Sequence, residues 1–253
     1  MSTGKYRIGT SGFSYKDWLG NFYPQFCPQA DFLRFYSSRF NAVEIDATFY
    51  RIPSAAVVER WCKNTPDDFV FSAKFPKAVT HEGTIEERLV VARRFIEVMK
   101  GLGDKQGPLL LQFAAGFGPE RFDLLIRLIE ALPSGPRYSI ELRKQAWLEV
   151  PALFDLLREK NIALCLIEHP RMPRMDIATA DFHYLRFLGD RSKIREDFSY
   201  LRDDRESDLH WWRQTIKKIV RVDQDLFAFF NNHYSGHSPS TAARMMTLLS
   251  ESD

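Results

Sequence analysis

The strongest constraint on the fold of this chain is a regular alternation of short apolar runs with helical patterns. Eight apolar runs can be distinguished, at residues 6–10, 42–46, 69–74, 109–112, 138–141, 162–168, 182–186 and 226–232. Amphipathic segments with helical periodicity lie between them, at residues 30–39, 54–63, 85–101, 119–132, 147–160, 208–222 and 238–249. Only the stretch 169–181, after the sixth run, lacks the length and pattern of a helix, and we expect a loop there.

This order predicts an α/β fold, a (β/α)8 TIM barrel in which a loop replaces the helix after strand 6. Eight strand–helix units with a mean spacing of roughly 30 residues match the ~250 residues of that fold. The competing architecture is an open, doubly wound sheet, but the turn after the first strand, residues 9–12, lacks the third glycine of a dinucleotide-binding loop. No low-complexity linker divides the chain, so we expect a single domain over residues 1–253.

Composition and charge narrow the class of protein. A net charge of +2 is too small to attract nucleic acid or a membrane surface over a long range. No apolar stretch approaches the ~18 residues that a membrane span requires, so no membrane partner is expected. Three widely spaced cysteines argue against a disulfide framework and favour a reducing compartment. We therefore expect a cytoplasmic protein, and the composition indicates no particular oligomeric state.

Polar side chains stand at or just beyond the end of almost every apolar run. They are Thr10, Glu44, Asp46, Lys74, Gln112, Glu141, Arg143, Glu168, Arg186 and Asn231. Internal salt bridges that fix the strand register would explain them, but buried ion pairs stabilise a protein less than apolar packing does. Because active sites of barrels lie at the carboxyl ends of the strands, we predict that these groups line a charged pocket there.

These residue types indicate acid–base chemistry on an anion. Glu141 and Glu168 are the candidate catalytic acid and base. Lys74 is a candidate catalytic or anion-binding amine, and an anion clamp is favoured over an imine-forming lysine because arginines accompany it. Arg143 and Arg186 carry the planar forks that suit carboxylate or phosphate. A metal centre is not predicted, because the chain has no tight ligand spacing and three cations compete, and no cofactor is indicated.

The loops that follow the runs add further candidates. Tyr50 follows the second run and is predicted to reach the ligand. The final loop contains Asn231, Asn232 and His233 before a helix capped at Ser238, and free amides there would match a barrel phosphate site. The aromatic first loop, residues 11–24, would serve either as a stacking platform or as a hydrophobic plug, whereas His81 is expected on the ordinary surface.

Three functions are compatible with this pattern. The first is an enzyme, possible classes being hydrolase, lyase and isomerase, that acts on a small anionic, phosphorylated or carboxylated, sugar-like molecule. The second is a nucleic-acid-binding or phosphodiester-processing barrel, which requires affinity that falls steeply with salt. The third is a non-catalytic ligand-binding protein.

The chain also resembles the YecE-like family, which is domain of unknown function 72. The resemblance is carried by residues 8–18, 40–50, 71–76, 107–113, 140–143, 184–187 and 230–233, in this order along nearly the whole chain. It implies a TIM barrel and no established activity. Two positions depart from the family pattern, since Asp46 stands where many relatives have Asn, and Leu188 precedes Gly189 where relatives have His-Gly.

Overall fold

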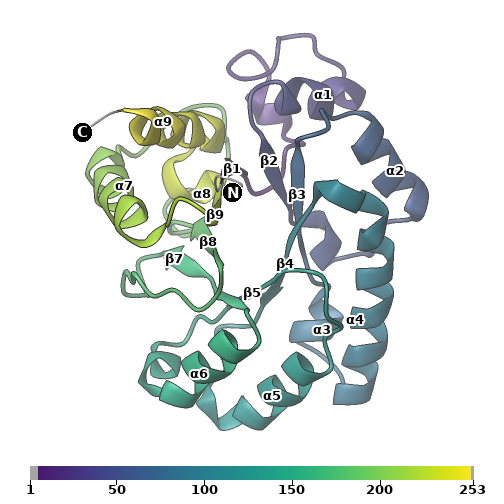
Figure 1. The fold of residues 1–253 in the computed structure, drawn as a ribbon. Helices are drawn as coiled ribbons and strands as arrows, with labels where there is room; N and C mark the ends of the chain where they lie inside the picture. The colour runs from purple at the N-terminus through teal and green to yellow at the C-terminus, as the bar shows by residue number, and fades with distance from the viewer. Residues whose placement is uncertain (1–4, 252–253) are drawn as a thin grey trace. The chain divides into compact units, whose positions relative to one another are not determined.

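The computed structural model describes residues 5–251, in which parallel strands alternate with helices along the chain (Figure 1). The strands are β1 (Tyr6–Thr10), β2 (Ala42–Ile45), β3 (Val70–Lys74), β4 (Gln106–Gln112), β5 (Tyr138–Glu141), β6 (Ala163–Leu164), β7 (Leu166–Glu168), β8 (Phe182–Phe187) and β9 (Asp225–Phe230). The α-helices are α1 (Phe32–Ser37), α2 (Ala55–Lys63), α3 (Lys77–Thr80), α4 (Ile85–Met99), α5 (Phe122–Glu130), α6 (Pro151–Glu159), α7 (Glu206–Ile219), α8 (Asn232–Ser235) and α9 (Ser238–Ser250). The predicted α/β alternation is thereby confirmed.

The strands belong to two parallel sheets. One has the order β1-β9-β8-β7 and the other the order β2-β3-β4-β5-β6. The predicted sixth strand is interrupted at Cys165, so that β6 and β7 belong to different sheets. Parallel neighbours bring their carboxyl ends to the same edge of a sheet, and this places polar residues that end consecutive strands next to one another.

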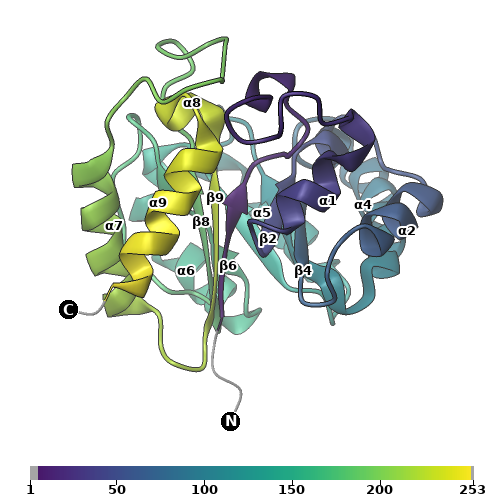
Figure 2. The same cartoon turned by 90° about the horizontal axis from the view of Figure 1, so that it is seen from above.

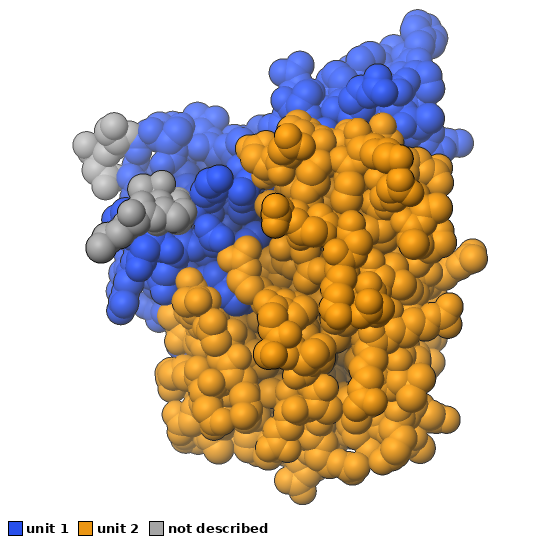
Figure 3. Space-filling view, turned by 45° about the vertical axis from the view of Figure 1, so that its right-hand side comes forward, with its two compact units in different colours: residues 1–44, 166–177, 182–253 blue, residues 45–165, 178–181 orange. Residues whose placement is uncertain are grey.

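The chain forms two compact units, which are coloured separately in Figure 3. Unit 1 contains residues 1–44, 166–177 and 182–253, and unit 2 contains residues 45–165 and 178–181. Both units combine segments that are separated in the sequence, which explains why no linker is visible in the composition. The single domain expected from the sequence stays a prediction.

Unit 1 is built around aromatic side chains of β8 and β9. Every residue of β8 is buried, and the rings of Phe187 and Phe230 stack with centroids 4.1 Å apart. Figure 2 shows α9 alongside β1 and β9, which it contacts, and α7 beside α9. Residues 226–230 of β9 are continuously apolar, as in a strand buried on both faces, whereas β8 also buries the polar side chains of His183 and Arg186.

Gly9 allows a close approach inside unit 1. A Cβ atom at this position would lie 1.9 Å from the Ala42 carbonyl oxygen and 2.7 Å from the Tyr36 hydroxyl. The Tyr36 hydroxyl accepts a hydrogen bond from the Thr10 amide and donates one to the Ala42 carbonyl, at 2.8 and 3.1 Å. The glycine of the first strand is therefore required for packing rather than for a phosphate-binding turn.

Unit 2 has an aliphatic core around β4. Leu109, Leu110 and Leu111 are fully buried. Helix α4 begins with a capping box, in which the Thr84 hydroxyl accepts from the Glu87 amide and the Glu87 carboxylate accepts from the Thr84 amide. Such a box satisfies two backbone donors that would otherwise lack a partner at the start of the helix.

Several predicted boundaries are corrected by the structure. Strand β2 ends at Ile45, because Asp46 already has helical backbone angles, and β9 ends at Phe230, before the two asparagines. Ser238 is the first residue of α9 rather than its N-cap, which is His237. Residues 169–181, all of which the structure describes, contain no helix, as predicted. Among residues 5–251 the longest helix, α4, has 15 residues, and no helix is long and apolar enough to cross a bilayer.

Candidate functional site

The predicted site residues divide between the two units. Unit 1 contains Thr10, Glu44, Glu168, Arg186, Asn231, Asn232 and His233, and unit 2 contains Asp46, Tyr50, Lys74, Gln112, Glu141 and Arg143. Each group can be described by its own contacts.

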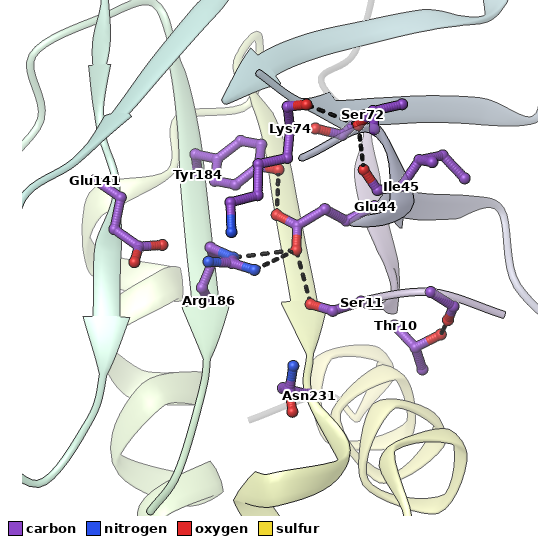
Figure 4. A network of polar contacts seen from close by, with 12 residues as sticks. Thr10, Ser11, Glu44, Ile45, Ser72, Lys74, Glu141, Tyr184, Arg186 and Asn231 are labelled. Atoms are coloured by element: carbon purple, nitrogen blue, oxygen red, sulfur yellow. Dashed lines mark hydrogen bonds and ion pairs between the residues drawn. The ribbon is translucent and has the colours of Figure 1, made fainter. Parts of the chain in front are cut away.

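A buried ion pair dominates the carboxyl ends of the strands in unit 1 (Figure 4). The Glu44 carboxylate accepts hydrogen bonds from the Arg186 Nη2 at 2.7 Å, from the Ser11 hydroxyl at 2.7 Å and from the Tyr184 hydroxyl at 2.7 Å. The exposed fraction is 0% for the Glu44 side chain and 2% for that of Arg186. The charge of Arg186 is therefore offset by Glu44. Sequence reasoning named Glu44 and Arg186 as pocket residues but did not predict that they pair, and it missed Ser11, although this residue directly follows the first strand.

Glu168 lies in a second polar cluster of unit 1. Its carboxylate accepts from the Arg174 Nε at 2.6 Å and Nη2 at 3.1 Å, and from the Trp212 indole nitrogen at 2.6 Å. Arg174 also pairs with Asp208. The hydrogen bond to Glu168 is the main reason that the pKa of Arg174 is raised. Arg174 lies in a loop without periodicity, so no sequence pattern pointed to it.

The two asparagines of the final loop hold the backbone in place. The Asn231 side chain caps α8 by accepting from the His233 amide at 3.0 Å. The Asn232 carbonyl oxygen accepts from the Trp18 indole at 3.3 Å and from the Ser238 amide at 3.1 Å. The prediction of free backbone amides at the start of α9 is therefore wrong at Ser238, because the Ser238 amide already donates to the Asn232 side chain.

Two other predicted residues of unit 1 also make internal bonds. The Thr10 hydroxyl donates to the Gly12 carbonyl at 2.6 Å. His233 Nδ1 lies 2.6 Å from the Ile194 carbonyl oxygen, a contact that requires a proton on Nδ1. Their predicted contacts with a ligand stay predictions.

His237 is a buried histidine with an incomplete set of hydrogen bonds. Its Nδ1 atom lies 2.7 Å from the Ser240 hydroxyl, whereas Nε2 has no hydrogen-bond partner among the described residues. Burial lowers the pKa of His237 to about 4. The unfolded chain binds this proton near pH 6.5, so the free energy of unfolding should fall by about 3 kcal/mol between pH 6.5 and pH 4 through this group, with no contribution from it above pH 6.5.

Replacing His237 by glutamine should remove the part of the fall in the free energy of unfolding between pH 6.5 and pH 4 that comes from this histidine. Urea unfolding at pH 7 and at pH 4 gives the loss of free energy of unfolding on acidification. The difference in this loss between wild type and variant is the contribution of His237, since the carboxylates titrate equally in both. His210→Gln is the matched control, because His210 is exposed on α7. Equal losses of stability on acidification in wild type and His237→Gln would contradict this assignment.

In unit 2, polar residues end three neighbouring strands. Lys74 ends β3, Gln112 ends β4 and Glu141 ends β5, and Gln112 and Glu141 are partners in the strand register. Glu141 is fully buried and accepts a close hydrogen bond from Arg143, whose side chain is 31% exposed. Gln112 donates to the Phe113 carbonyl. The structure thus brings these residues together on adjacent strands, as the sequence predicted.

The Phe49 ring contacts two basic side chains of unit 2, Lys74 and His81. The Lys74 ammonium lies 4.0 Å from the centre of the Phe49 ring, and the His81 ring centre is 5.2 Å from it. The pKa of His81 is lowered. Burial is the largest cause, and the positive charges of Lys74 and Arg143 contribute less. His81 is half-buried rather than on the ordinary surface, and both cations act on it. This part of unit 2 is therefore electropositive and partly shielded from water.

The two remaining candidates of unit 2 lie in the turn after β2. Asp46 is half-exposed and precedes a 3-10 helix, Ala47–Phe49, so the alternation of a strand no longer determines where it points. Tyr50 is 82% exposed, and its ring centre is 5.3 Å from that of Phe49.

Two cavities, one in each unit, lie away from the predicted site residues, and the described part of the chain contains no metal cluster. Among residues 5–251 no group of three or more His, Cys, Asp or Glu side chains could hold a metal ion. A cavity of about 310 Å³ in unit 1 is lined in part by Arg202, Arg205 and Arg244, and one of about 410 Å³ in unit 2 by Lys100 and Arg137. Of the predicted site residues, all of which the structure describes, none lines either cavity.

Comparison with known proteins shows relatives that cover between 64% and 97% of this chain. The curated UPF0759 protein YecE of Escherichia coli strain K12 is 34% identical over 189 residues, which are 64% of this chain and 70% of that protein. The UPF0759 protein YunF of Bacillus subtilis strain 168 is 23% identical and covers 96% of this chain and 94% of its own length. A crystal structure of a DUF72 family protein from Thermotoga maritima MSB8 is 27% identical, with a TM-score of 0.80, and the match covers 97% of this chain and 99% of that one.

The family profile described as "Protein of unknown function DUF72" matches residues 7–253. This match confirms the resemblance drawn from the motifs. The curated relatives and the solved structure agree with it. The chain belongs to the DUF72 family.

Proposed function

We propose that this protein is an enzyme that acts on a small anionic, phosphorylated or carboxylated, sugar-like ligand at the carboxyl ends of β3, β4 and β5. One arrangement carries the proposal: the Lys74 ammonium and the half-buried His81 both contact the Phe49 ring, the charges of Lys74 and Arg143 act on His81, and Arg143 donates to the buried carboxylate of Glu141. Two cations that share a partly shielded environment favour the binding of an anion, because screening by water is weaker there.

Each group has a defined part in this proposal. Lys74 is a point charge that would bind an anionic oxygen, and Arg143 would present the donors that Glu141 does not occupy. Glu141 would transfer the proton, since the ion pair with Arg143 stabilises its ionised form, which is the form that accepts one. Glu168 and Arg186 belong to unit 1, where they pair with Arg174 and Glu44, and the proposal, which concerns unit 2, gives them no role.

We include the closed (β/α)8 barrel and a cytoplasmic location in the proposal. The barrel is supported by the order of the strands, which pair in parallel: β2 to β6 follow one another in one sheet, β7 to β9 follow one another in the other, and β9 pairs with β1. If β6 and β7, separated by Cys165 alone, count as one strand, the described residues supply eight strand positions. The cytoplasm is supported by three free cysteines in the described chain, as is typical of a reducing compartment.

Replacing Lys74 by glutamine should weaken the binding of inorganic phosphate about 10- to 100-fold, the loss expected for one hydrogen bond to a charged group. Isothermal titration calorimetry at constant ionic strength measures the change. Lys144→Gln is the matched control, because Lys144 pairs with the exposed Glu120. Equal affinities in Lys74→Gln and wild type, or no phosphate binding by the wild type, would refute the proposed site. Binding of oligonucleotides that weakens steeply with salt would favour the nucleic-acid function instead.

A further inference from the structure

We infer that His81 is a third anion-binding residue of this site, which binds the ligand through its Nε2 atom in the protonated form. The inference rests on the proposed function and concerns the same phosphate or carboxylate group of the ligand. It adds a proton donor to the site, because an imidazolium that contacts the ligand can return a proton to it, whereas Glu141 accepts one.

The first observation is that one side of the His81 ring is held by the protein and the other is open. The hydroxyl of Thr80, a residue that is only 2% exposed, lies 2.8 Å from His81 Nδ1. Within residues 5–251 the Nε2 atom has no hydrogen-bond partner, and it is not shut off from solvent. A histidine with one ring nitrogen oriented in this way presents the other to a ligand.

The second observation is the place of the His81 ring in unit 2. Its centre lies 5.2 Å from that of the Phe49 ring, and the two rings meet at an angle of 79°. The Lys74 ammonium contacts the same Phe49 ring, 4.0 Å from its centre. The histidine and the ammonium therefore share one aromatic neighbour beside the end of β3.

The third observation is the set of charges that act on His81. Burial is the largest cause of its lowered pKa, followed by the positive charges of Lys74 on β3 and Arg143 after β5. Arg88 on α4 lowers the pKa further, and Glu82 acts in the opposite direction. Because the lowered value lies below the ordinary one of 6.5, the ring is mostly neutral at pH 7 as long as no anion is bound.

A bound anion changes this balance of charges. Its negative charge offsets those of Lys74 and Arg143 and favours the imidazolium form of His81, so the pKa of His81 rises on binding. By linkage, the anion then binds more tightly at a pH where the ring is protonated. The affinity that depends on His81 should therefore increase as the pH falls from 7.5 to 5.5.

The direct test is an NMR titration of the histidine ring signals, without and with saturating inorganic phosphate. The His81 signal, assigned by its loss in His81→Gln, should titrate at a higher pH when phosphate is bound. His210 is the internal control, because it is exposed on α7 of unit 1. Its titration should stay the same.

Calorimetry measures the same coupling as an affinity. The loss of phosphate affinity in His81→Gln, relative to wild type, should be about 3- to 10-fold larger at pH 5.5 than at pH 7.5. The titration of phosphate itself affects both proteins equally and cancels in this comparison. His210→Gln is the matched control and should bind phosphate as wild type does at both pH values.

The outcomes separate this inference from the proposed function. Suppose that wild type binds phosphate and Lys74→Gln binds it more weakly. If His81 then titrates at the same pH with and without phosphate, or His81→Gln loses equal affinity at both pH values, the inference is overturned and the proposed site stands. If wild type binds no phosphate, or Lys74→Gln binds it as tightly as wild type, the proposed function fails, and the inference fails with it.

Discussion

Glu44→Ala should lower the free energy of unfolding by about 3–5 kcal/mol, because it removes the carboxylate that pairs with a buried arginine. Arg186 donates to Glu44 through Nε at 3.1 Å and Nη2 at 2.7 Å, and neither side chain is open to water. Ser11 and Tyr184 would lose their acceptor as well. Urea unfolding followed by circular dichroism measures the loss, provided that the slope of the transition stays unchanged.

A double replacement shows whether the loss of stability in Glu44→Ala comes from the loss of a charge partner or from the loss of side-chain volume. Glu44→Leu combined with Arg186→Met removes both charges at similar volume, so we expect it to recover most of the stability that Glu44→Ala loses. The exposed pair of Glu59 and Lys63 provides the control, and Glu59→Ala should cost less than about 1 kcal/mol. A double variant as unstable as Glu44→Ala would show that the pair is not the source of the effect.

Glu141→Gln should reduce turnover about 10²- to 10⁴-fold, the usual contribution of a general acid or base, while ligand affinity stays nearly the same. Glutamine has nearly the same shape and keeps an oxygen that accepts the hydrogen bond from Arg143, but it cannot accept a proton at neutral pH. The measurement is product formation from whichever phosphorylated or carboxylated sugar the wild type converts in a substrate screen, together with the affinity for the same compound.

The control for this variant is Glu120→Gln, because Glu120 is an exposed carboxylate paired with Lys144. Unchanged turnover in Glu141→Gln would remove Glu141 from its role. If the wild type binds such compounds and converts none of them, the protein is a binding protein rather than an enzyme.

Periodicity predicted those parts of the fold that depend on regular backbone. The carboxyl ends of β3, β4 and β5 were located from the pattern alone, and Lys74, Gln112 and Glu141 are found there. The rule of alternating faces stops where the strand stops, which is why it could not place Asp46.

Contacts between distant segments could not be predicted in the same way. Arg174 reaches Glu168 from a loop, and Trp212 reaches it from α7, 44 residues along the chain. Neither partner belongs to a local pattern, since a hydrogen bond between two elements depends on their packing. The position of His81 against Phe49 has the same origin, and it changed the interpretation of a loop histidine.

The most direct test of the central claim, that Lys74 and Arg143 together bind an anion beside Glu141, is a crystal structure of the protein grown with phosphate. We predict a phosphate oxygen at about 3 Å from the Lys74 ammonium and another at a similar distance from the Arg143 guanidinium. Phosphate bound only in the cavity lined by Arg202, Arg205 and Arg244, or bound nowhere, would contradict the claim.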